Sequence, residues 1–416
     1  MNYFVNTPCG AVQGTAGRHP GTVAYKGIRY ATAGRWEYPR QITGWEGIYD
    51  ATQYGACAWQ LRAFQENSGF YYNEFRKDEC YAYSEDCLFL NIFSPAQAKA
   101  GDDLPVLVYI HGGAFQDGCG HEKPFNEPVW PTKSVIGVTL NYRLGPLGFL
   151  CLPQLEEEAG FTGNYGLYDQ MTALQWVRDN IRAFGGNPEN ITLMGQSAGA
   201  GSVQLQASSS LTDGLFQKAV MSSGCGYGDL RIITAENACA LGEALMARCG
   251  CETLAQFRAV PPQALYTAWQ AIKQEHPFAT RPVIDGNFVV EGAKLKDMPY
   301  MAGTTSHDVM MPTLLHMTQE RMMQKKGYTW YFDRMLPGDD RGAWHSSDLW
   351  YWFGTLENCW RPFTQKDHAL SQQMVASLCH FARTGSPELP AWTPSGPQQD
   401  QVLIWGEQDA HMGSVD

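Results

Sequence analysis

The sequence predicts an α/β protein in which a mostly parallel sheet carries helices on both faces. Residues 104–110 and 135–140 form continuous apolar runs, as expected of parallel strands buried on both sides. Residues 167–184 carry apolar side chains at three- and four-residue spacing, which predicts a helix, and the apolar run 191–194 follows it. Strands that alternate with helices in this way form parallel sheets, because each helix returns the chain to the same edge.

The other elements follow from the same patterns in chain order. Glycine and proline punctuate short runs near the N-terminus at hairpin spacing, residues 36–59 predict a loop, and residues 64–83 show little periodicity. We expect further strands at 10–14, 22–28, 88–93, 218–221, 300–303, 328–332 and 402–405, and further helices at 236–248, 262–272 and 369–383. No repeat or linker divides the chain, so we expect a single domain over residues 1–416.

Composition and charge exclude several classes of partner. A chain of 416 residues with a hydrophobic fraction of 44% can bury a large core. Its net charge of −12 argues against nucleic acid and anionic membrane surfaces as partners. The first residues lack the basic and apolar segments of a signal peptide, and no apolar run reaches the roughly 18 residues of a membrane span. We therefore expect a cytoplasmic protein, or a secreted one if a leader has been removed; no oligomeric state is predicted.

The cysteines predict neither a disulfide scaffold nor a metal site. Twelve cysteines in a chain of this length do not form the dense pattern of a small secreted domain. Cys249-Gly250-Cys251 lacks a second cysteine or histidine pair at zinc spacing, so we interpret these residues as structural.

The pentapeptide Gly195-Gln196-Ser197-Ala198-Gly199 is the strongest candidate for chemistry. It follows an apolar strand and precedes a run of small residues that can begin a helix, which is the context of a nucleophile elbow. The turn is so tight that side chains two residues before and after the serine would collide, hence the two glycines. We predict that Ser197 is a catalytic nucleophile.

A second glycine motif predicts the donors that such a serine needs. His111-Gly112-Gly113-Ala114 directly follows the apolar strand 104–110. Residues with little side chain let backbone N–H groups converge on one point, where they stabilise an oxyanion. We predict an oxyanion hole formed by the N–H groups of Gly113, Ala114 and Ala198.

The order of these motifs resembles that of the type-B carboxylesterases, the α/β-hydrolase family that also contains the cholinesterases. The resemblance implies an α/β-hydrolase fold, a serine–histidine–acid triad, a small-molecule ester substrate, and no metal or organic cofactor. It spans nearly the whole chain and is carried by segments 25–31, 84–91, 141–149, 183–190 and 381–387.

The resemblance also implies the base and the acid. His345 lies in a segment similar to the family's G-x-x-H-G-x-E/D, with Ser346 in place of the second glycine. The acid must lie between nucleophile and base in chain order. Asp308 occupies that place after a strand, although the family usually has glutamate followed by glycine, and here Val309 follows. Asp285 is the competing acid, but it fits a turn better.

Four further residues receive roles near this triad. Ser223 is either a hydrogen-bond partner of the acid or an ordinary serine at a strand end, and the sequence favours neither. Gln196 stands where cholinesterases carry glutamate, which favours a neutral ester over a cationic choline ester. Phe115 and Trp344 are hypothesised to line a pocket for aryl or medium-chain groups.

Two departures from the family concern the lid and a cysteine pair. Asp308 and His345 are only 37 residues apart, where the family has a longer insert, so we expect reduced lid segments around residues 60–83 and 309–344. Cys57 and Cys87 resemble the pair that secreted relatives join in a disulfide, and the sequence leaves their state open.

These observations together predict a carboxylic ester hydrolase that forms an acyl-enzyme. The expected substrates are neutral small or aromatic esters, hydroxycinnamoyl esters among them. The same motifs fit an amide, carbamate or lactone hydrolase. A non-catalytic adhesion protein of the same fold is a further alternative, although such relatives typically lose the serine.

Overall fold

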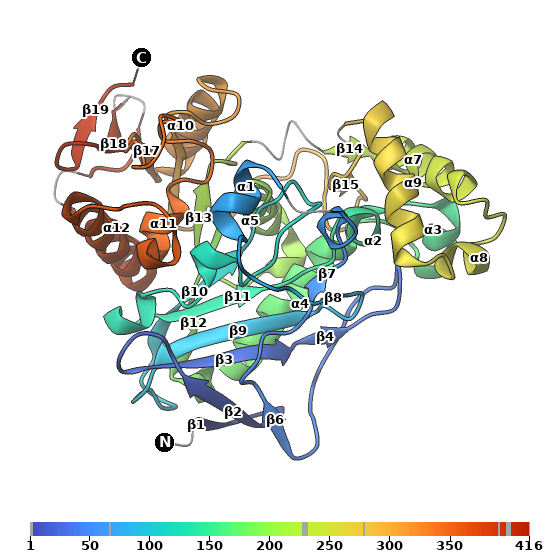
Figure 1. Ribbon diagram of the computed structural model, residues 1–416, viewed down its shortest axis with the longest axis horizontal. Helices are drawn as coiled ribbons and strands as arrows, with labels where there is room; N and C mark the ends of the chain where they lie inside the picture. The colour runs from blue at the N-terminus through green and yellow to red at the C-terminus, as the bar shows by residue number, and fades with distance from the viewer. Residues whose placement is uncertain are drawn as a thin grey trace.

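Parallel strands form the centre of the computed structural model, which describes residues 3–65, 68–226, 232–277, 279–389, 392–396 and 401–415 (Figure 1). The large sheet has thirteen strands within these ranges. They are β1 (Tyr3–Thr7), β2 (Gly10–Ala16), β3 (Thr22–Arg29), β6 (Ile48–Asp50), β9 (Phe89–Pro95), β10 (Leu104–Ile110), β11 (Ile136–Leu140), β12 (Gly186–Gln196), β13 (Lys218–Ser222), β16 (Tyr300–Thr305), β17 (Tyr328–Phe332), β18 (Val402–Trp405) and β19 (His411–Gly413).

The strand order is β1-β2-β3-β9-β11-β10-β12-β13-β16-β17-β18-β19, with β6 paired to β2. All pairings from β11 to β18 are parallel. The strands at the N-terminal edge pair antiparallel from β1 to β9, and β19 pairs antiparallel at the other edge. The predicted mostly parallel sheet is therefore confirmed, with antiparallel strands confined to its margins.

The central strand β10 shows why helices cover both faces. Its alternate residues Val106, Val108 and Ile110 belong to one apolar core, together with side chains from α4 (Tyr165–Asn180) and α5 (Ala198–Ser208). Leu107 and Tyr109 point the other way, into a core with α11 (Leu349–Phe353) and α12 (Gln365–Thr384). Side chains alternate between the faces of a strand, so a continuous apolar run needs a helical layer on each side.

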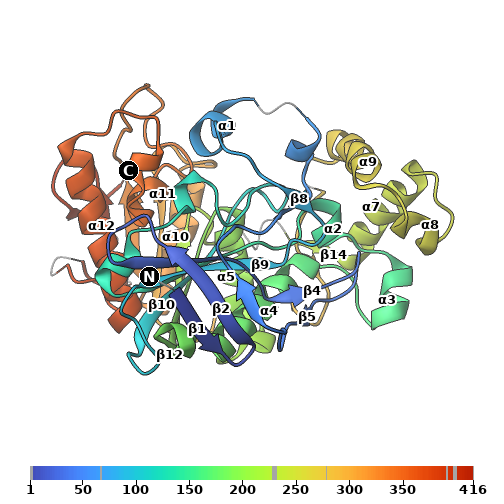
Figure 2. The ribbon, with the colours of Figure 1, turned by 60° about the horizontal axis from the view of Figure 1, so that its bottom comes forward.

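A third apolar cluster includes side chains of α3 (Pro153–Ala159), α7 (Ala235–Arg248), α8 (Leu254–Arg258) and α9 (Pro262–Glu275). These helices lie at one end of the molecule, far from α12, in both Figure 1 and Figure 2. The remaining helices of the described ranges are α1 (Phe70–Phe75), α2 (Gly145–Phe149) and α10 (Thr313–Lys325). Short 3-10 turns are η1 (Leu61–Ala63), η2 (Lys123–Phe125), η3 (Trp130–Lys133), η4 (Ile181–Phe184), η5 (Ser210–Thr212) and η6 (Leu356–Asn358). Small two-stranded sheets pair β4 (Ala31–Thr32) with β5 (Arg40–Gln41), β7 (Cys57–Ala58) with β8 (Tyr83–Ser84), and β14 (Ile233–Thr234) with β15 (Val283–Ile284).

The structure corrects several local predictions. Residues 36–59 are not all loop, since they contain β5, β6 and β7. Helix α1 lies inside the stretch 64–83, and with six residues it is too short to show a helical period. Segment 309–344 holds α10 and also β17, which is a strand of the central sheet between β16 and β18. None of the helices in the described ranges has the length and apolar character needed to traverse a lipid bilayer.

The cysteine pair implied by the resemblance is not joined. Cys57 and Cys87 are both buried free thiols. The Cys57 Sγ lies instead 3.7 Å from His121 Nε2.

Candidate active site

Ser197 occupies the tight turn between β12 and α5. Its backbone has φ 56° and ψ −125°, outside the regions that non-glycine residues ordinarily adopt. A Cβ on Gly195 would lie 2.3 Å from the Gly199 carbonyl oxygen, and one on Gly199 would lie 2.1 Å from that of Ile110. The glycines on either side of Ser197 are therefore required by the close approach of the backbone.

The structure brings three predicted residues into one hydrogen-bonded chain. Ser197 Oγ lies 2.9 Å from His345 Nε2, and His345 Nδ1 lies 2.5 Å from Asp308 Oδ1. The Asp308 side chain is fully buried, and the His345 side chain is 13% exposed. A serine, a histidine and a carboxylate in this order can activate the serine hydroxyl as a nucleophile.

Contacts between two loops hold the acid and the histidine together. The His307 N–H donates to the Ala343 carbonyl at 3.0 Å, which pairs the loop after β16 with the loop before α11. Gly342 has φ 68°, and a Cβ there would lie 2.5 Å from His307 Nδ1. From α1, the Tyr71 hydroxyl donates to the His345 carbonyl at 3.2 Å. The helix that the sequence did not predict thus anchors the histidine loop.

Asp308 is stabilised in its charged form despite its burial. Burial raises the pKa of its carboxyl, but the adjacent His345 imidazole, the Ser223 hydroxyl and the Thr305 N–H outweigh this effect. The net pKa of Asp308 lies below its ordinary value. The Thr305 and Val309 N–H groups donate to its two oxygens at 3.1 and 2.7 Å. The Ser223 hydroxyl lies beside the carboxylate without meeting strict hydrogen-bond geometry.

A second buried carboxylate, Asp348, lies three residues after His345. Its Oδ2 accepts hydrogen bonds from Ser222 Oγ at 2.7 Å and Trp352 Nε1 at 3.1 Å, and its Oδ1 has no partner among the described residues. Burial, together with the charge of Asp308, raises the pKa of Asp348 to about 6. Asp348 occupies the acidic position of the histidine motif, and that motif was the available signal, yet sequence reasoning assigned it no role.

The loop after β10 carries the predicted oxyanion donors. Gly113 and Ala114 both have positive φ, 105° and 56°. The backbone N–H groups of Gly113, Ala114 and Ala198 donate to no acceptor within the described ranges, so they are available to a ligand. Burial lowers the pKa of His111 in the same loop to about 4, which leaves this imidazole neutral.

Ser197, His345, Gly113 and Ala114 line a cavity of about 350 Å³. Of the three predicted pocket residues, only Gln196 lines it, with its Nε2 3.3 Å from His345 Nε2. Phe115 instead packs on Phe149 in the core, and Trp344 packs edge-on against Phe70, so neither is among the residues that line this cavity. The apolar lining comes from Tyr71, Phe75, Phe125, Val309 and Leu349.

The charged side chains at this cavity are paired with one another. Arg62 lies 3.6 Å from Asp117 and 3.1 Å from Glu122. Glu122 also accepts from the buried Arg76 at 2.7 Å. The pairs compensate charge within the wall, so the cavity suits an uncharged ligand.

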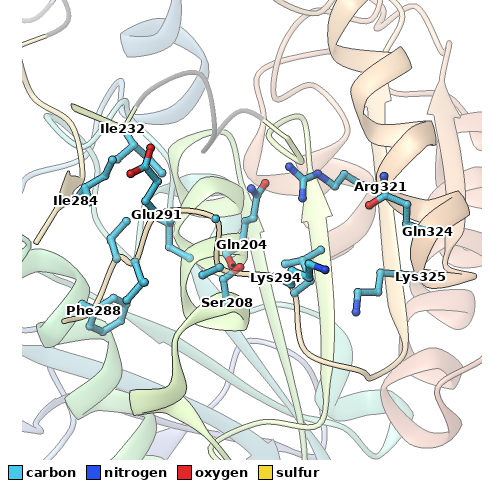
Figure 3. Close-up of a pocket in the computed structure, with 16 residues that line it drawn as sticks. Gln204, Ser208, Ile232, Ile284, Phe288, Glu291, Lys294, Arg321, Gln324 and Lys325 are labelled. Carbon is cyan, nitrogen blue, oxygen red and sulfur yellow. Dashed lines mark hydrogen bonds between the residues drawn. The ribbon is translucent and has the colours of Figure 1, made fainter. Parts of the chain in front are cut away.

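A larger cavity of about 710 Å³ lies elsewhere, between α5, α10 and the segment around residues 284–295 (Figure 3). Gln204 and Ser208 reach it from α5, and Arg321 and Lys325 reach it from α10. Its described lining contains no histidine or cysteine, and the Ser208 hydroxyl donates to the Gln204 carbonyl at 2.9 Å. Among its described residues, Ser208 therefore has no histidine base, whereas Ser197 at the smaller cavity contacts His345, so the smaller cavity is the candidate active site.

Known proteins similar to this chain are esterases and lipases. A sequence model of the carboxylesterase family matches residues 2–330 and 310–414. The bile salt-activated lipase of Mus musculus is 37% identical over 309 residues, which cover 68% of this chain and 48% of that protein. The para-nitrobenzyl esterase of Bacillus subtilis (strain 168) is 41% identical over 248 residues, 58% of this chain and 47% of that protein. The matched region thus spans about half the length of these curated relatives.

Solved structures give the same result over the full chain. A thermophilic PNB esterase superposes with a TM-score of 0.87 at 28% identity, covering 99% of this chain and 98% of that one. A second PNB esterase has a TM-score of 0.82 at 28% identity, with 99% and 97% covered.

Proposed function

We propose that this chain, which belongs to the carboxylesterase family, hydrolyses carboxylic esters at Ser197. Its structural neighbours confirm the α/β-hydrolase fold that the sequence predicts. The observation that carries this proposal is the chain of contacts from Ser197 Oγ to His345 Nε2 and from His345 Nδ1 to Asp308 Oδ1, at 2.9 and 2.5 Å. Ser197 is the nucleophile, His345 the general base, and Asp308 the acid that orients the imidazole.

The first half of the reaction forms an acyl-enzyme. His345 Nε2 takes the hydroxyl proton of Ser197 as its Oγ attacks the ester carbonyl. The Asp308 carboxylate accepts a hydrogen bond from the Nδ1–H group of the imidazole. This contact keeps the proton on Nδ1, leaves Nε2 free to act as the base, and stabilises the imidazolium that forms. The imidazolium then gives its proton to the leaving alcohol, and the C–O bond to that alcohol breaks.

Backbone N–H groups stabilise the charge that develops in this step. The N–H groups of Gly113, Ala114 and Ala198 donate to the oxyanion of the tetrahedral intermediate, and Ser223 helps to keep Asp308 charged. In the second half, His345 removes a proton from water, and the resulting hydroxyl group attacks the acyl-enzyme carbonyl. The imidazolium then returns the proton to Ser197 Oγ as the bond from Oγ to the acyl carbon breaks, and the acid is released. Apart from the ester and water, these steps use groups of the chain.

The substrate class follows from the lining of the cavity. Paired charges and the neutral Gln196 amide favour an uncharged ester. Tyr71, Phe75 and Phe125 supply aromatic surface for an acyl or aryl group, and hydroxycinnamoyl esters belong in the test panel. We assign the role of a reduced lid to the described part of residues 60–83 and to Val309, because Arg62, Tyr71, Phe75 and Val309 line the cavity. The rest of segment 309–344 does not line this cavity, since it contains α10 and the central strand β17.

The test is the turnover of p-nitrophenyl esters by Ser197→Ala. We expect kcat/KM to fall by about 10⁴-fold or more, since the nucleophile is lost. Ser208→Ala is the matched control, because Ser208 lies on the same helix and faces the larger cavity, and its activity should equal that of the wild type.

Turnover by Ser197→Ala at the wild-type level would refute the assignment. Failure of an organophosphate to label the wild-type protein would favour a non-catalytic role. A panel of amides, carbamates and lactones beside the esters decides which acyl transfer the site prefers.

A further inference from the structure

Three soft donor side chains meet in the interior behind the loop that carries Gly113 and Ala114. Cys57 belongs to β7, whereas Cys119 and His121 belong to the loop that follows β10. All three residues are buried, and the donor atoms they offer lie within 4.8 Å of one another. The two thiols are in hydrogen-bonding reach of each other, and Cys119 is in the same relation to His121. None of the three takes part in the proposed esterase reaction.

The separation of one sulfur and the imidazole nitrogen matches a tetrahedral metal site, and all three donor atoms lie within 4.8 Å of one another. Zinc binds thiolate at about 2.3 Å and imidazole nitrogen at about 2.0–2.1 Å, which places sulfur and nitrogen about 3.6 Å apart in a tetrahedron. The Cys57 Sγ lies 3.7 Å from His121 Nε2. We propose that Cys57, Cys119 and His121 form a binding site for one Zn²⁺ ion, with the fourth position left to water.

The backbone around the donors is fixed independently of any ion. The Gln60 side chain donates to the Gly118 carbonyl and accepts from its N–H, both at 3.0 Å. The Gly120 N–H donates to Asn141 Oδ1 at 2.8 Å, so both neighbours of Cys119 are held. On the other segment, the Cys57 N–H donates to the Ala82 carbonyl at 2.8 Å. The site is therefore preorganised, and ordering it on metal binding costs little.

The surroundings suit a neutral metal centre. Two thiolates and one Zn²⁺ are together neutral, so the ion adds no net charge to the interior. The nearby Arg76 guanidinium is paired with Glu122 at 2.7 Å. The Tyr54 ring stacks on His121, with centroids 4.5 Å apart and planes 5° apart, and thereby fixes the orientation of the imidazole.

A disulfide between Cys57 and Cys119 is the competing use of the two thiols. Both thiols are free in the structure. A disulfide between them would not account for the contacts that His121 makes with both sulfur atoms. The presence of His121 as a third donor favours the metal site over the disulfide. The bound ion would link the loop that follows β10 to the β7–β8 pair. It therefore stabilises this loop and takes no part in ester cleavage.

The test is metal binding by the folded, full-length chain. Wild-type protein, stripped by a chelator in the presence of reductant, should take up one Zn²⁺ per chain, protect two thiols from alkylation and unfold at a higher temperature. Co²⁺ should give the near-ultraviolet charge-transfer absorption of thiolate ligands. Cys57→Ser and Cys119→Ser should each weaken binding by more than about 100-fold, because loss of a direct ligand exceeds the 10–100-fold cost of losing an outer partner.

Three controls separate the possible causes. Cys80→Ser removes an exposed thiol outside the cluster and should bind Zn²⁺ like the wild type. Cys87→Ser should do the same, since Cys87 is not among the three donors. Ser197→Ala should bind one Zn²⁺ even though its esterase activity is lost, which keeps this result independent of the proposed function. Absence of stoichiometric binding by folded wild-type protein, binding that survives Cys57→Ser, or a Cys57–Cys119 disulfide in reductant-treated protein would overturn the proposal.

Discussion

Asp308 and Asp348 are two buried aspartates in the loops around His345, and the protein shifts their pKa values in opposite directions. The pKa of Asp308 lies below its ordinary value, whereas that of Asp348 is raised to about 6. Burial raises the pKa of both. Asp308 contacts the imidazole and accepts two backbone N–H groups, while Asp348 has Ser222 and Trp352 as donors to a single oxygen.

The comparison shows that burial alone does not decide whether an aspartate is held in its charged form. Hydrogen bonds to the charged form lower the pKa of a carboxyl, whereas burial raises it. Both oxygens of Asp308 accept hydrogen bonds, but Oδ1 of Asp348 has no partner among the described residues. The two aspartates therefore provide a matched pair for mutation, because each can be replaced by the isosteric asparagine.

The largest expected effect is that of Asp308→Asn. The amide cannot accept the Nδ1 proton in the way the carboxylate does, so His345 loses the tautomer that activates Ser197. We expect kcat for p-nitrophenyl esters to fall by about 10⁴-fold with the fold intact, as measured by steady-state kinetics and circular dichroism. If Asp308→Asn and Asp348→Asn lost activity equally, the distinction between the two aspartates would be wrong.

Asp348→Asn should act mainly on stability. The folded-state pKa of about 6 lies above the ordinary value of 3.8, so the folded protein binds this proton more tightly than the unfolded chain does. Wild-type stability therefore decreases as pH rises between these values, by at most about 3 kcal/mol. Asparagine removes this penalty and keeps an acceptor for Ser222 and Trp352.

The measurement is thermal unfolding of wild type and Asp348→Asn at several pH values. The unfolding temperature of the variant, relative to the wild type, should rise from about pH 4 to about pH 7, whereas kcat/KM at about pH 8 should change by less than about tenfold. A difference that does not vary with pH would show that Asp348 titrates as an ordinary surface carboxyl.

The smallest effect is expected for Ser223→Ala. The Ser223 hydroxyl contributes to the lowered pKa of Asp308, so its removal should raise that pKa toward the ordinary value. Because the pKa of Asp308 is lower in the folded than in the unfolded protein, its charged form stabilises the fold at pH values above the unfolded-state pKa. This stabilisation is lost as pH falls through the folded-state pKa. With that pKa raised, the variant should unfold at a higher pH than the wild type during acid unfolding. We expect kcat/KM to fall by about threefold at neutral pH, about 0.6 kcal/mol. Wild-type behaviour in both measurements would make Ser223 an ordinary serine at a strand end.

Much of the fold and the candidate site could be predicted from local patterns. The apolar run 104–110 coincides with β10, and the predicted strand 328–332 coincides with β17. The structure brings the three residues predicted as a triad within hydrogen-bond distance. Their positions are set by short motifs, because a tight turn or a strand end imposes its requirements on adjacent residues.

The pocket could not be predicted in the same way. Phe115 and Trp344 are close to the site in sequence, but both pack into the core, and the cavity is lined instead by Tyr71 and Phe75 of α1. Which face of an aromatic residue meets a cavity depends on the packing of distant segments. Helix α1 has only six residues, which is too short for a helical repeat of apolar residues to be recognised in the sequence.

The sequence by itself determined the α/β class and the order along the chain of the residues that we propose as donors, nucleophile, acid and base, because each motif depends on neighbours along the chain. Only the tertiary structure decided which of two buried aspartates is held in its charged form, which aromatic residues line the cavity, and that Cys57 meets Cys119 and His121 rather than Cys87. These outcomes depend on contacts between segments far apart in the chain, where burial and hydrogen-bond partners are set by packing.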